Sequence, residues 1–218
     1  MKKIKDYKSA ALAALNGKWA PAVICAVVYV ILTMAVSMSS AFADPDSPDG
    51  IFVLAFLLQM VLSLIVTVPA GIGYYNAHKE LLVSGDDKMA ANMFKIGFTN
   101  WFRNVWTMVL YGIAAAIGCI CLIVPGIIIS FGCALVPYIL VDKPELSAVE
   151  VLKLSWNMMK GHKWQFFVLS LSFIGWGILC IPTLFIGYFW LCPYIYTTMA
   201  AYYLDVKAEY EANNNTNN

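Results

Sequence analysis

The sequence predicts an all-α integral membrane protein, a polytopic bundle of about six transmembrane helices in three hairpins. Each hairpin is expected to follow an amphipathic helix in the cytoplasm or at the membrane interface. Of the 218 residues, 61% are hydrophobic and 12% are charged, against about 25% charged residues in a typical soluble domain. Six apolar runs carry no charge, and all basic residues fall on one side of the membrane if these runs are spans. A soluble fold would lack polar surface, whereas lipid accommodates outward-facing apolar side chains.

The predicted spans follow from the apolar runs. A helix needs about 20 residues to cross the hydrocarbon core of a bilayer. None of the runs contains Lys, Arg, Asp or Glu, each of which is costly at the centre of a span. The run 126–141 is the shortest, and its full crossing stays open. The six runs cover residues 19–42, 51–77, 105–124, 126–141, 164–181 and 183–204.

Charge decides whether 105–141 is one long helix or a hairpin. Pro125-Gly126 in its middle is a turn signal. With six spans, the fourteen basic residues fall in groups of five, four, four and one, all on the same side. A single span over 105–141 would send Lys143, Lys153, Lys160 and Lys163 to the other side. The positive-inside rule therefore favours the hairpin and places both termini in the cytoplasm. The first run is too long for the core of a signal peptide and is interpreted as a retained helix.

Three pseudo-repeats are predicted, at about 1–78, 87–141 and 147–204, within a single membrane domain over 1–206. Each begins with an amphipathic segment: Ile4, Tyr7, Ala11 and Leu15 share one helical face in the first, and Ser147 and Glu150 are predicted to form a capping box in the third. Each segment then reaches a tryptophan, which suits the aromatic belt of a membrane. These interface anchors are Trp19, Trp101 and Trp164. The segments could lie in the interface or be loop helices packed on the bundle. The Asn-rich tail, 207–218, is predicted to be disordered.

Each returning helix carries a proline towards its cytoplasmic half, namely Pro69, Pro137 and Pro193. Proline removes a backbone donor and frees the carbonyl four residues earlier, so carbonyls near Ile65, Cys133 and Phe189 would lose their partners. The three kinks could surround a small cavity, or they could only bend helices for packing, as proline does in membranes.

Small residues at intervals of four are predicted to bring helices close together. Ala114 and Gly118 form such a pair in the third span, and Gly126, Ser130 and Ala134 form a series in the fourth. This pattern lets backbones approach where lipid provides no hydrophobic driving force.

No residue pattern indicates catalysis. The predicted spans hold no ionisable Lys, Arg, Asp or Glu, the usual marks of ion and proton pathways. The six cysteines form no CxxC pair, and no metal site or cofactor is expected. His78 and His162 are expected to be solvated at the cytoplasmic interface. The net charge of +1 gives no reason to expect nucleic acid as a partner. The protein is therefore not expected to be an enzyme.

The order of several short motifs resembles a known family. They are Gly17-Lys18-Trp19, Ile123-Val124-Pro125-Gly126-Ile127, Val141-Asp142-Lys143-Pro144, Ser155 with Lys160-Gly161, Leu171-Ser172-Phe173-Ile174-Gly175-Trp176, Pro193-Tyr194 and Ala201-Tyr202-Tyr203. This order resembles the bacterial integral-membrane family catalogued as domain of unknown function 975, over residues 4–206. The resemblance implies a protein of the bacterial cytoplasmic (inner) membrane, related to membrane domains attached to some glycerophosphodiesterases. It supplies no catalytic residues, and the phosphodiesterase barrel is absent from this sequence.

Two functions follow as hypotheses. The first is a non-catalytic membrane module that binds lipid or a membrane or cytoplasmic protein partner. The alternative is a transporter or channel component with a cavity at the Pro69, Pro137 and Pro193 kinks; transporters often use broken helices and internal repeats. An intramembrane enzyme is the least favoured reading because acids, bases and metal ligands are missing.

Overall fold

The computed structural model describes residues 2–38, 49–121, 123–182 and 186–216, and every regular element in them is helical. The α-helices are α1 (Ile4–Leu15), α2 (Trp19–Ser37), α3 (Asp49–Leu62), α4 (Val68–Val83), α5 (Met89–Phe98), α6 (Trp101–Cys121), α7 (Ile123–Gly132), α8 (Val136–Asp142), α9 (Ala148–Met158), α10 (Lys163–Leu179) and α11 (Tyr188–Thr216). A π-helical turn, Ser63–Thr67, joins α3 to α4. The all-helical class is confirmed. The end of the predicted span 19–42 and the start of the predicted span 183–204 fall partly outside the described residues.

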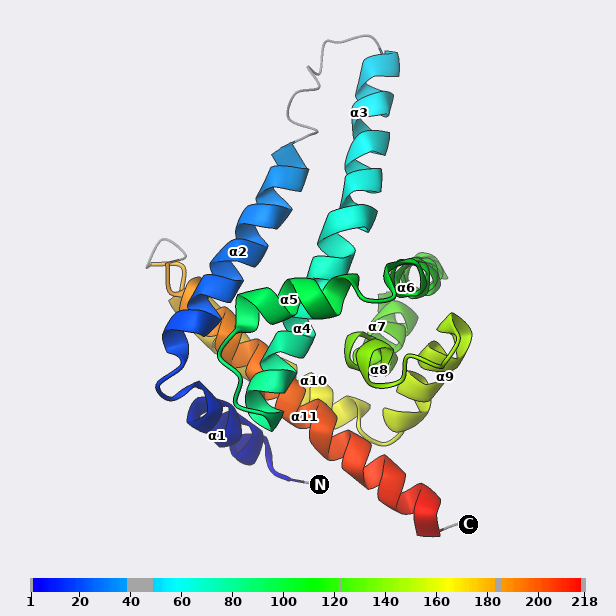
Figure 1. The fold of residues 1–218 in the computed structure, drawn as a ribbon. Coiled ribbons are helices and arrows are strands. Elements are labelled where there is room, and N and C mark those ends of the chain that lie inside the picture. Colours follow the sequence, from blue (N-terminus) through cyan, green and yellow to red (C-terminus); the bar gives the residue numbers. More distant parts are fainter. Residues whose placement is uncertain (1, 39–48, 122, 183–185, 217–218) are drawn as a thin grey trace.

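Three helical stretches are long and apolar enough to cross a membrane. They are Trp19–Ser37, Val53–Val83 and Trp101–Cys119, while the apolar stretch Gly126–Asp142, occupied by α7 and α8, and the helix Lys163–Leu179 are shorter. These stretches support a membrane protein; they do not confirm six spans. Figure 1 looks almost along α6, whereas α2 and α3 lie in the plane of the page, so α6 runs across the direction of the α2–α3 pair.

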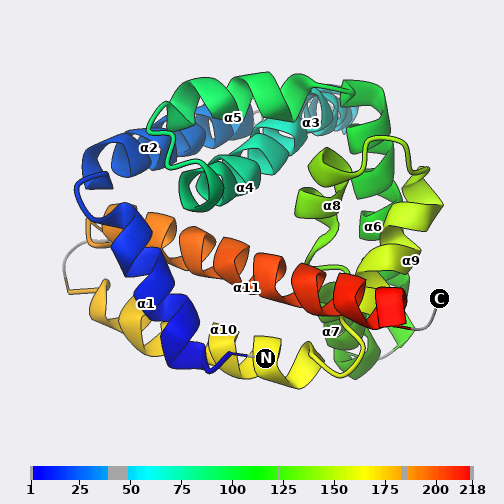
Figure 2. The ribbon, with the colours of Figure 1, turned by 60° about the horizontal axis from the view of Figure 1, so that its bottom comes forward.

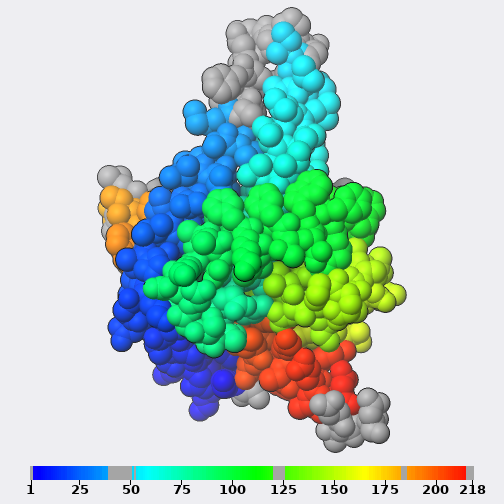
Figure 3. Space-filling model, in the orientation of Figure 1, coloured from blue at the N-terminus to red at the C-terminus, as the bar shows by residue number. Residues whose placement is uncertain are grey.

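The helices α2 and α3 project from the rest of the molecule (Figures 1 and 3). Their surface is apolar, with Ile31 at 59%, Leu54 at 68% and Phe56 at 54% exposure. Such large exposed side chains are unfavourable in water and suit a lipid environment.

Helices occupy the three segments predicted to lead the repeats. In α1, the residues Tyr7, Ala11 and Leu15 are buried, on the face that the periodicity predicted. In α9, Ser147 and Glu150 form the predicted capping box: the backbone N–H of Ser147 lies 2.8 Å from the Glu150 carboxylate that accepts its hydrogen bond. This box satisfies backbone groups that a helix N-terminus leaves unpaired.

The segment α5 packs directly against α4. A Cβ atom added to Gly73 would clash with the backbone carbonyl of Met93, and one added to Gly97 would clash with the carbonyl of Pro69. Only glycine therefore allows the two backbones to approach this closely.

Within the predicted hairpin 105–141, α6 and α7 pack against each other, with a different turn from the predicted one; a hairpin of two membrane spans there stays a prediction. The helix α6 ends at Cys121 and α7 already begins at Ile123, so Pro125 lies in the first turn of α7, where a missing N–H costs no helical hydrogen bond. A Cβ added to Gly118 would lie 3.1 Å from the Cα of Gly126. The predicted close contact of small residues is thus confirmed at this pair.

The longest helix, α11, crosses the middle of the molecule and contacts α1, α2, α4, α9 and α10 (Figure 2). One buried cluster gathers on α8, α9, α10 and α11, around Tyr138, Val151 and Tyr202, and a second lies among α2, α4 and α5, around Cys25, Tyr74 and Met93. The prediction of a disordered tail from residue 207 is wrong as far as Thr216, because α11 continues to that residue. The Ala, Glu and Lys residues that open the tail favour helix.

Candidate functional site

A network of charged side chains joins α4, α8 and α11. The Asp142 carboxylate, at the end of α8, binds the ammonium group of Lys79 from α4. It also accepts hydrogen bonds from the Lys207 ammonium at 2.6 Å and from the Tyr203 hydroxyl at 2.8 Å, both on α11. The Lys79 side chain is only 5% exposed and that of Asp142 13%. Buried charges need such pairing, because an isolated charge is strongly disfavoured away from water.

Sequence reasoning missed this network. Lys79 and Lys207 served there only as signals of orientation, and Asp142 only as part of a family motif. Lys79 and Asp142 lie 63 positions apart, so no local spacing could have linked them. The only signal in the sequence was the position of Lys79 close after the apolar run 51–77, where a basic residue can come to lie beside buried helices.

His78 is buried, and the expectation that it would be solvated is wrong. Its side chain has no exposed surface, and its Nδ1 lies 2.9 Å from the carbonyl oxygen of Tyr74. Its ring packs edge-on against Tyr74, with centroids 4.6 Å apart. Because α5 and α11 both pack against α4, the side chain is shielded although it lies near the end of its apolar run.

Several buried polar atoms near this network have no hydrogen-bond partner among the described residues. These atoms belong to α4, α8 and α11. The amide of Asn76 also donates a 2.8 Å hydrogen bond to the Pro137 carbonyl oxygen and so connects α4 to α8. The atoms are the Tyr74 hydroxyl, Asn76 Oδ1, His78 Nε2, the Tyr138 hydroxyl and Thr197 Oγ1. Buried polar groups are normally satisfied, so such atoms suggest water or a ligand. Within the described part of the chain, no group of three His, Cys, Asp or Glu residues could hold a metal ion.

His162 is also held by contacts. Its Nε2 lies 3.6 Å from the Glu209 carboxylate, and its side chain is 17% exposed. Its backbone carbonyl accepts a 2.9 Å hydrogen bond from the Tyr202 hydroxyl. The expectation that this histidine would be simply solvated is therefore also wrong, and it anchors the start of α10 to α11.

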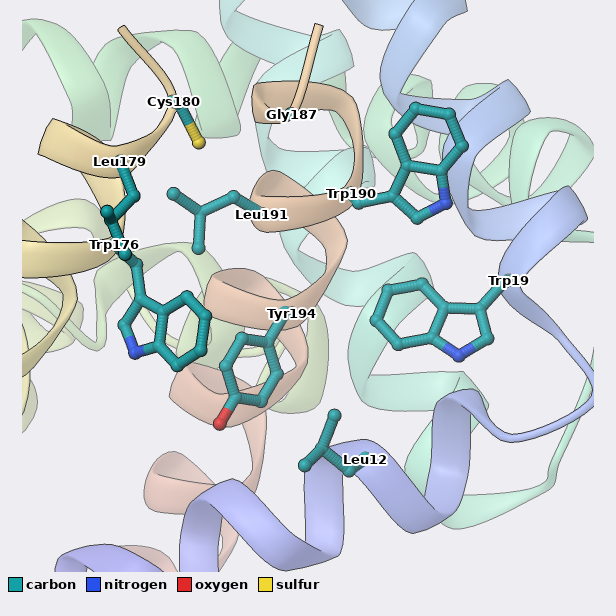
Figure 4. Close-up of a pocket in the computed structure, with 9 residues that line it drawn as sticks. All are labelled: Leu12, Trp19, Trp176, Leu179, Cys180, Gly187, Trp190, Leu191 and Tyr194. Carbon is teal, nitrogen blue, oxygen red and sulfur yellow. The ribbon is translucent and has the colours of Figure 1, made fainter. Parts of the chain in front are cut away.

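An apolar pocket of about 400 Å³ lies between α1, the start of α2, the end of α10 and the start of α11 (Figure 4). Trp176 stands on one side, Trp19 and Trp190 on the other, and Leu12 of α1 closes the base of the view. Its lining carries no ammonium, guanidinium or carboxylate group. The lining residues are Leu12, Trp19, Trp176, Leu179, Cys180, Gly187, Trp190, Leu191 and Tyr194.

A lysine lies beside this tryptophan pocket. Lys8 precedes Leu12 by one turn of α1, and its ammonium group sits 4.4 Å from the centre of the Phe173 ring. Phe173 in turn packs edge-on against Tyr194 of the lining, at 5.4 Å between ring centroids. Burial lowers the pKa of Lys8. A cation is thus held against the aromatic wall at the α1 end of an otherwise uncharged pocket.

Pro69 frees a carbonyl, as predicted, and the structure shows what binds it. The π-helical turn Ser63–Thr67 ends just before Pro69. The carbonyl oxygen of Ile65, four residues before the proline, accepts a 3.1 Å hydrogen bond from the indole N–H of Trp101. The predicted interface anchor Trp101 therefore supplies this carbonyl with a donor that Pro69 lacks, and a kink at Pro69 stays a prediction.

Pro137 does not kink a continuous helix, so that part of the prediction is wrong. The chain leaves the helical conformation at residues 133–135, and Pro137 lies in the first turn of α8, a position that tolerates proline. The Cys133 carbonyl, predicted to be freed, accepts a 3.1 Å hydrogen bond from the N–H of Val136. Pro193 lies inside α11 as predicted. None of the three prolines lines the tryptophan pocket, and a cavity among them stays a prediction.

The other two predicted anchors differ in their surroundings. Trp19 lines the tryptophan pocket. Trp164, at the start of α10, is 73% exposed, and the Phe167 ring lies 5.3 Å from its ring centre.

Comparison with known proteins places the chain in a family. Residues 49–210, most of the chain, match the family model described as "Protein of unknown function (DUF975)". The chain belongs to this family. The DUF975 match covers α3 to α11 as far as residue 210 and includes the Asp142 network, but leaves out α1 and α2, which supply Leu12 and Trp19 of the tryptophan pocket. Neither curated proteins nor solved structures gave a match.

Proposed function

We propose that this protein is a non-catalytic module of the bacterial cytoplasmic membrane that binds the acyl chain of a lipid in the tryptophan pocket. In this proposal the chain crosses the membrane six times, with both termini in the cytoplasm, as its charge distribution favours; such a topology requires α6, which runs across the α2–α3 pair in Figure 1, to turn towards their direction in the bilayer. The observation that carries the proposal is an uncharged pocket of about 400 Å³ walled by three tryptophans. Ligand pockets of this size are lined mainly by apolar and aromatic side chains.

The position of α1 supports this proposal. Leu12, which borders the pocket, is 47% exposed, so the base of the pocket faces the surroundings rather than the protein core. The same helix presents Lys8 against Phe173. An acyl chain against the tryptophans would bring the polar part of a lipid towards this ammonium group, and such apolar and basic surfaces together favour membrane lipids.

Filling the pocket tests the proposal. Leu12→Trp adds bulk at an exposed position, and Leu58→Trp is the matched control because Leu58 on α3 is 51% exposed and lies outside the lining. Both variants would be purified in mild detergent, and retained lipid counted by native mass spectrometry. We expect the Leu58→Trp variant to keep the lipid of the unaltered protein and the Leu12→Trp variant to lose it. Equal retention by the two variants would contradict the proposal.

The alternative function, a transporter or channel component, has its own supporting observation. The Tyr74 hydroxyl, Asn76 Oδ1 and His78 Nε2, which have no hydrogen-bond partner among the described residues, lie buried on α4. The amide nitrogen of Asn76 donates to the carbonyl of Pro137. Buried polar groups of this kind line the solute paths of transporters. Uptake of solutes into proteoliposomes tests it, with His78→Phe as the variant expected to change flux. Absence of flux over a broad solute panel would exclude this alternative.

A further inference from the structure

A second groove lies between α9 and the α6–α7 hairpin, on different helices from the tryptophan pocket. Its volume is about 460 Å³. One part of its wall is apolar, from Ala114, Ile129 and Leu152, and another part carries polar and basic side chains. The lining residues are Ala114, Ile129, Cys133, Leu152, Lys153, Trp156 and Asn157.

The wall formed by α9 is held in place by specific contacts. The Ser155 hydroxyl donates a 2.9 Å hydrogen bond to the carbonyl oxygen of Gly132 at the end of α7. The Trp156 ring lies so close to Gly132 that a Cβ atom there would clash with it. On the ring, the Lys163 ammonium sits 3.1 Å from the centre. Trp156 is thus fixed between a glycine and a cation, and the groove is a preformed feature.

Basic groups gather at this end of the groove. Lys153 belongs to the lining, and the positive charge of Lys160 acts on Lys163 beside Trp156. The acidic residue of the same helix, Glu150, has its carboxylate bound to the hydroxyl of Ser147 at 2.7 Å and to that residue's backbone N–H. The charge of Lys153 also acts on Glu150, but no carboxylate belongs to the lining of the groove as the structure describes it. Lys153 is the basic residue of that lining, and the Lys163 ammonium lies on the ring of Trp156, another lining residue.

We propose that this groove binds an anionic phospholipid, with an acyl chain along Ala114, Ile129 and Leu152 and the headgroup phosphate at Lys153. The inference rests on the proposed lipid-binding function for its ligand class, but it concerns a separate site with a charge preference. Charge complementarity selects the ligand, because clustered lysines at a membrane surface each contribute about 1 kcal/mol to the binding of anionic lipid. The Asn157 amide adds a neutral donor at the same end.

Charge-neutral variants test the preference for anionic lipid. The full chain in detergent would be mixed with equimolar phosphatidylglycerol and phosphatidylcholine, and bound lipid measured by native mass spectrometry. We expect the unaltered protein to favour phosphatidylglycerol and Lys153→Gln to reduce this preference about fivefold, the ratio that 1 kcal/mol corresponds to. Lys153 is exposed, so its replacement leaves the fold intact. Lys95→Gln on the exposed surface of α5 makes the same charge change away from the groove and should keep the preference.

A filling variant locates the site. Ala114→Trp should remove the phosphatidylglycerol of this groove, whereas Leu12→Trp in the tryptophan pocket should leave the preference unchanged. Loss of the preference in Leu12→Trp alone would assign the lipid to the tryptophan pocket and overturn this inference. Equal uptake of both lipids by the unaltered protein would also overturn it. So would a dimer of the unaltered protein that carries no phosphatidylglycerol and that Ala114→Trp dissociates, because a second copy of the chain would then cover the groove. If Leu12→Trp retains as much lipid as the unaltered protein while Lys153→Gln lowers the preference for phosphatidylglycerol, lipid binding in this groove is supported and the proposed role of the tryptophan pocket is refuted.

Discussion

The hydroxyl of Tyr7 donates a 2.7 Å hydrogen bond to the carboxylate of Asp205, which lies 198 positions later in the chain. The bond ties α1 to α11, and the backbone N–H of Lys2 donates to the same carboxylate at 3.3 Å. It fixes one wall of the tryptophan pocket, since α1 carries Leu12.

Tyr7→Phe is expected to lower the free energy of unfolding by about 1.5 kcal/mol, because a buried hydrogen bond to a charged group is lost while the ring stays in place. Thermal unfolding in detergent, followed by circular dichroism, would measure this change. Tyr210→Phe, on the same C-terminal helix, is the control and should shift the unfolding midpoint little. An equally large shift of the unfolding midpoint in Tyr210→Phe would show that the Tyr7–Asp205 hydrogen bond does not stabilise the protein specifically.

The same contact predicts a pH dependence. Partial burial raises the pKa of Asp205, but hydrogen bonds from Tyr7 and from the Lys2 N–H, with the Lys2 charge, outweigh it and hold the pKa below its ordinary value. A depressed folded-state pKa stabilises the fold above the unfolded-state pKa, near 3.9, and this contribution is lost as the pH falls through the lower folded-state value. Acid titration of unfolding should therefore show a smaller loss of stability for Asp205→Asn than for the unaltered protein.

Asp142→Asn should destabilise the protein by about 3 kcal/mol, because it leaves the buried Lys79 ammonium without its counter-charge. Lys207 is 29% exposed and can still reach water, so Lys207→Gln should cost less. Combining Asp142→Asn with Lys79→Met should recover part of the loss. A double variant no more stable than Asp142→Asn would show that the Lys79 charge is not the cause. Unfolding midpoints of the four proteins decide between these outcomes.

The glycine crossing of α4 and α5 gives a matched pair of variants. Gly73→Ala should cost about 1–3 kcal/mol or more, because its methyl group would clash with the Met93 carbonyl and separate the helices. Gly112→Ala is the control, since nothing lies within 4 Å of a Cβ atom at that position of α6, and alanine favours helix. If Gly73→Ala and Gly112→Ala had the same thermal stability, the close approach of α4 and α5 at Gly73 would be contradicted.

Labelling from each side of the membrane tests the number of spans. Single cysteines at Ser47 and Lys153, in a cysteine-free background, should react from opposite sides if the chain crosses six times. If only the three long apolar stretches cross, both positions lie on the same side. An impermeant thiol reagent applied to intact and opened membranes would separate the two topologies.

The sequence predicted what repeats locally and missed what depends on distant pairing. The buried face of α1, the capping box at Ser147 and the approach of Gly118 to Gly126 all follow from short spacings along one or two helices. The Asp142 network joins three helices far apart in the sequence, so no spacing of residues along the chain could predict it. The break before Pro137 was missed for a related reason: an apolar run without charge looks the same whether it is one helix or two short ones. His78 was misjudged because its burial depends on α5 and α11.

The placement of α11 has a consequence for biosynthesis. This helix is made after α1, α2, α4, α9 and α10, yet all five pack against it. These helices are therefore synthesised before the element that joins them. Tyr7 can bind Asp205, and Asp142 can bind Lys207, only after α11 has been made. The tertiary structure therefore cannot be complete before α11 has been synthesised, and a chain cut short before residue 188 would lack the helix that these five share.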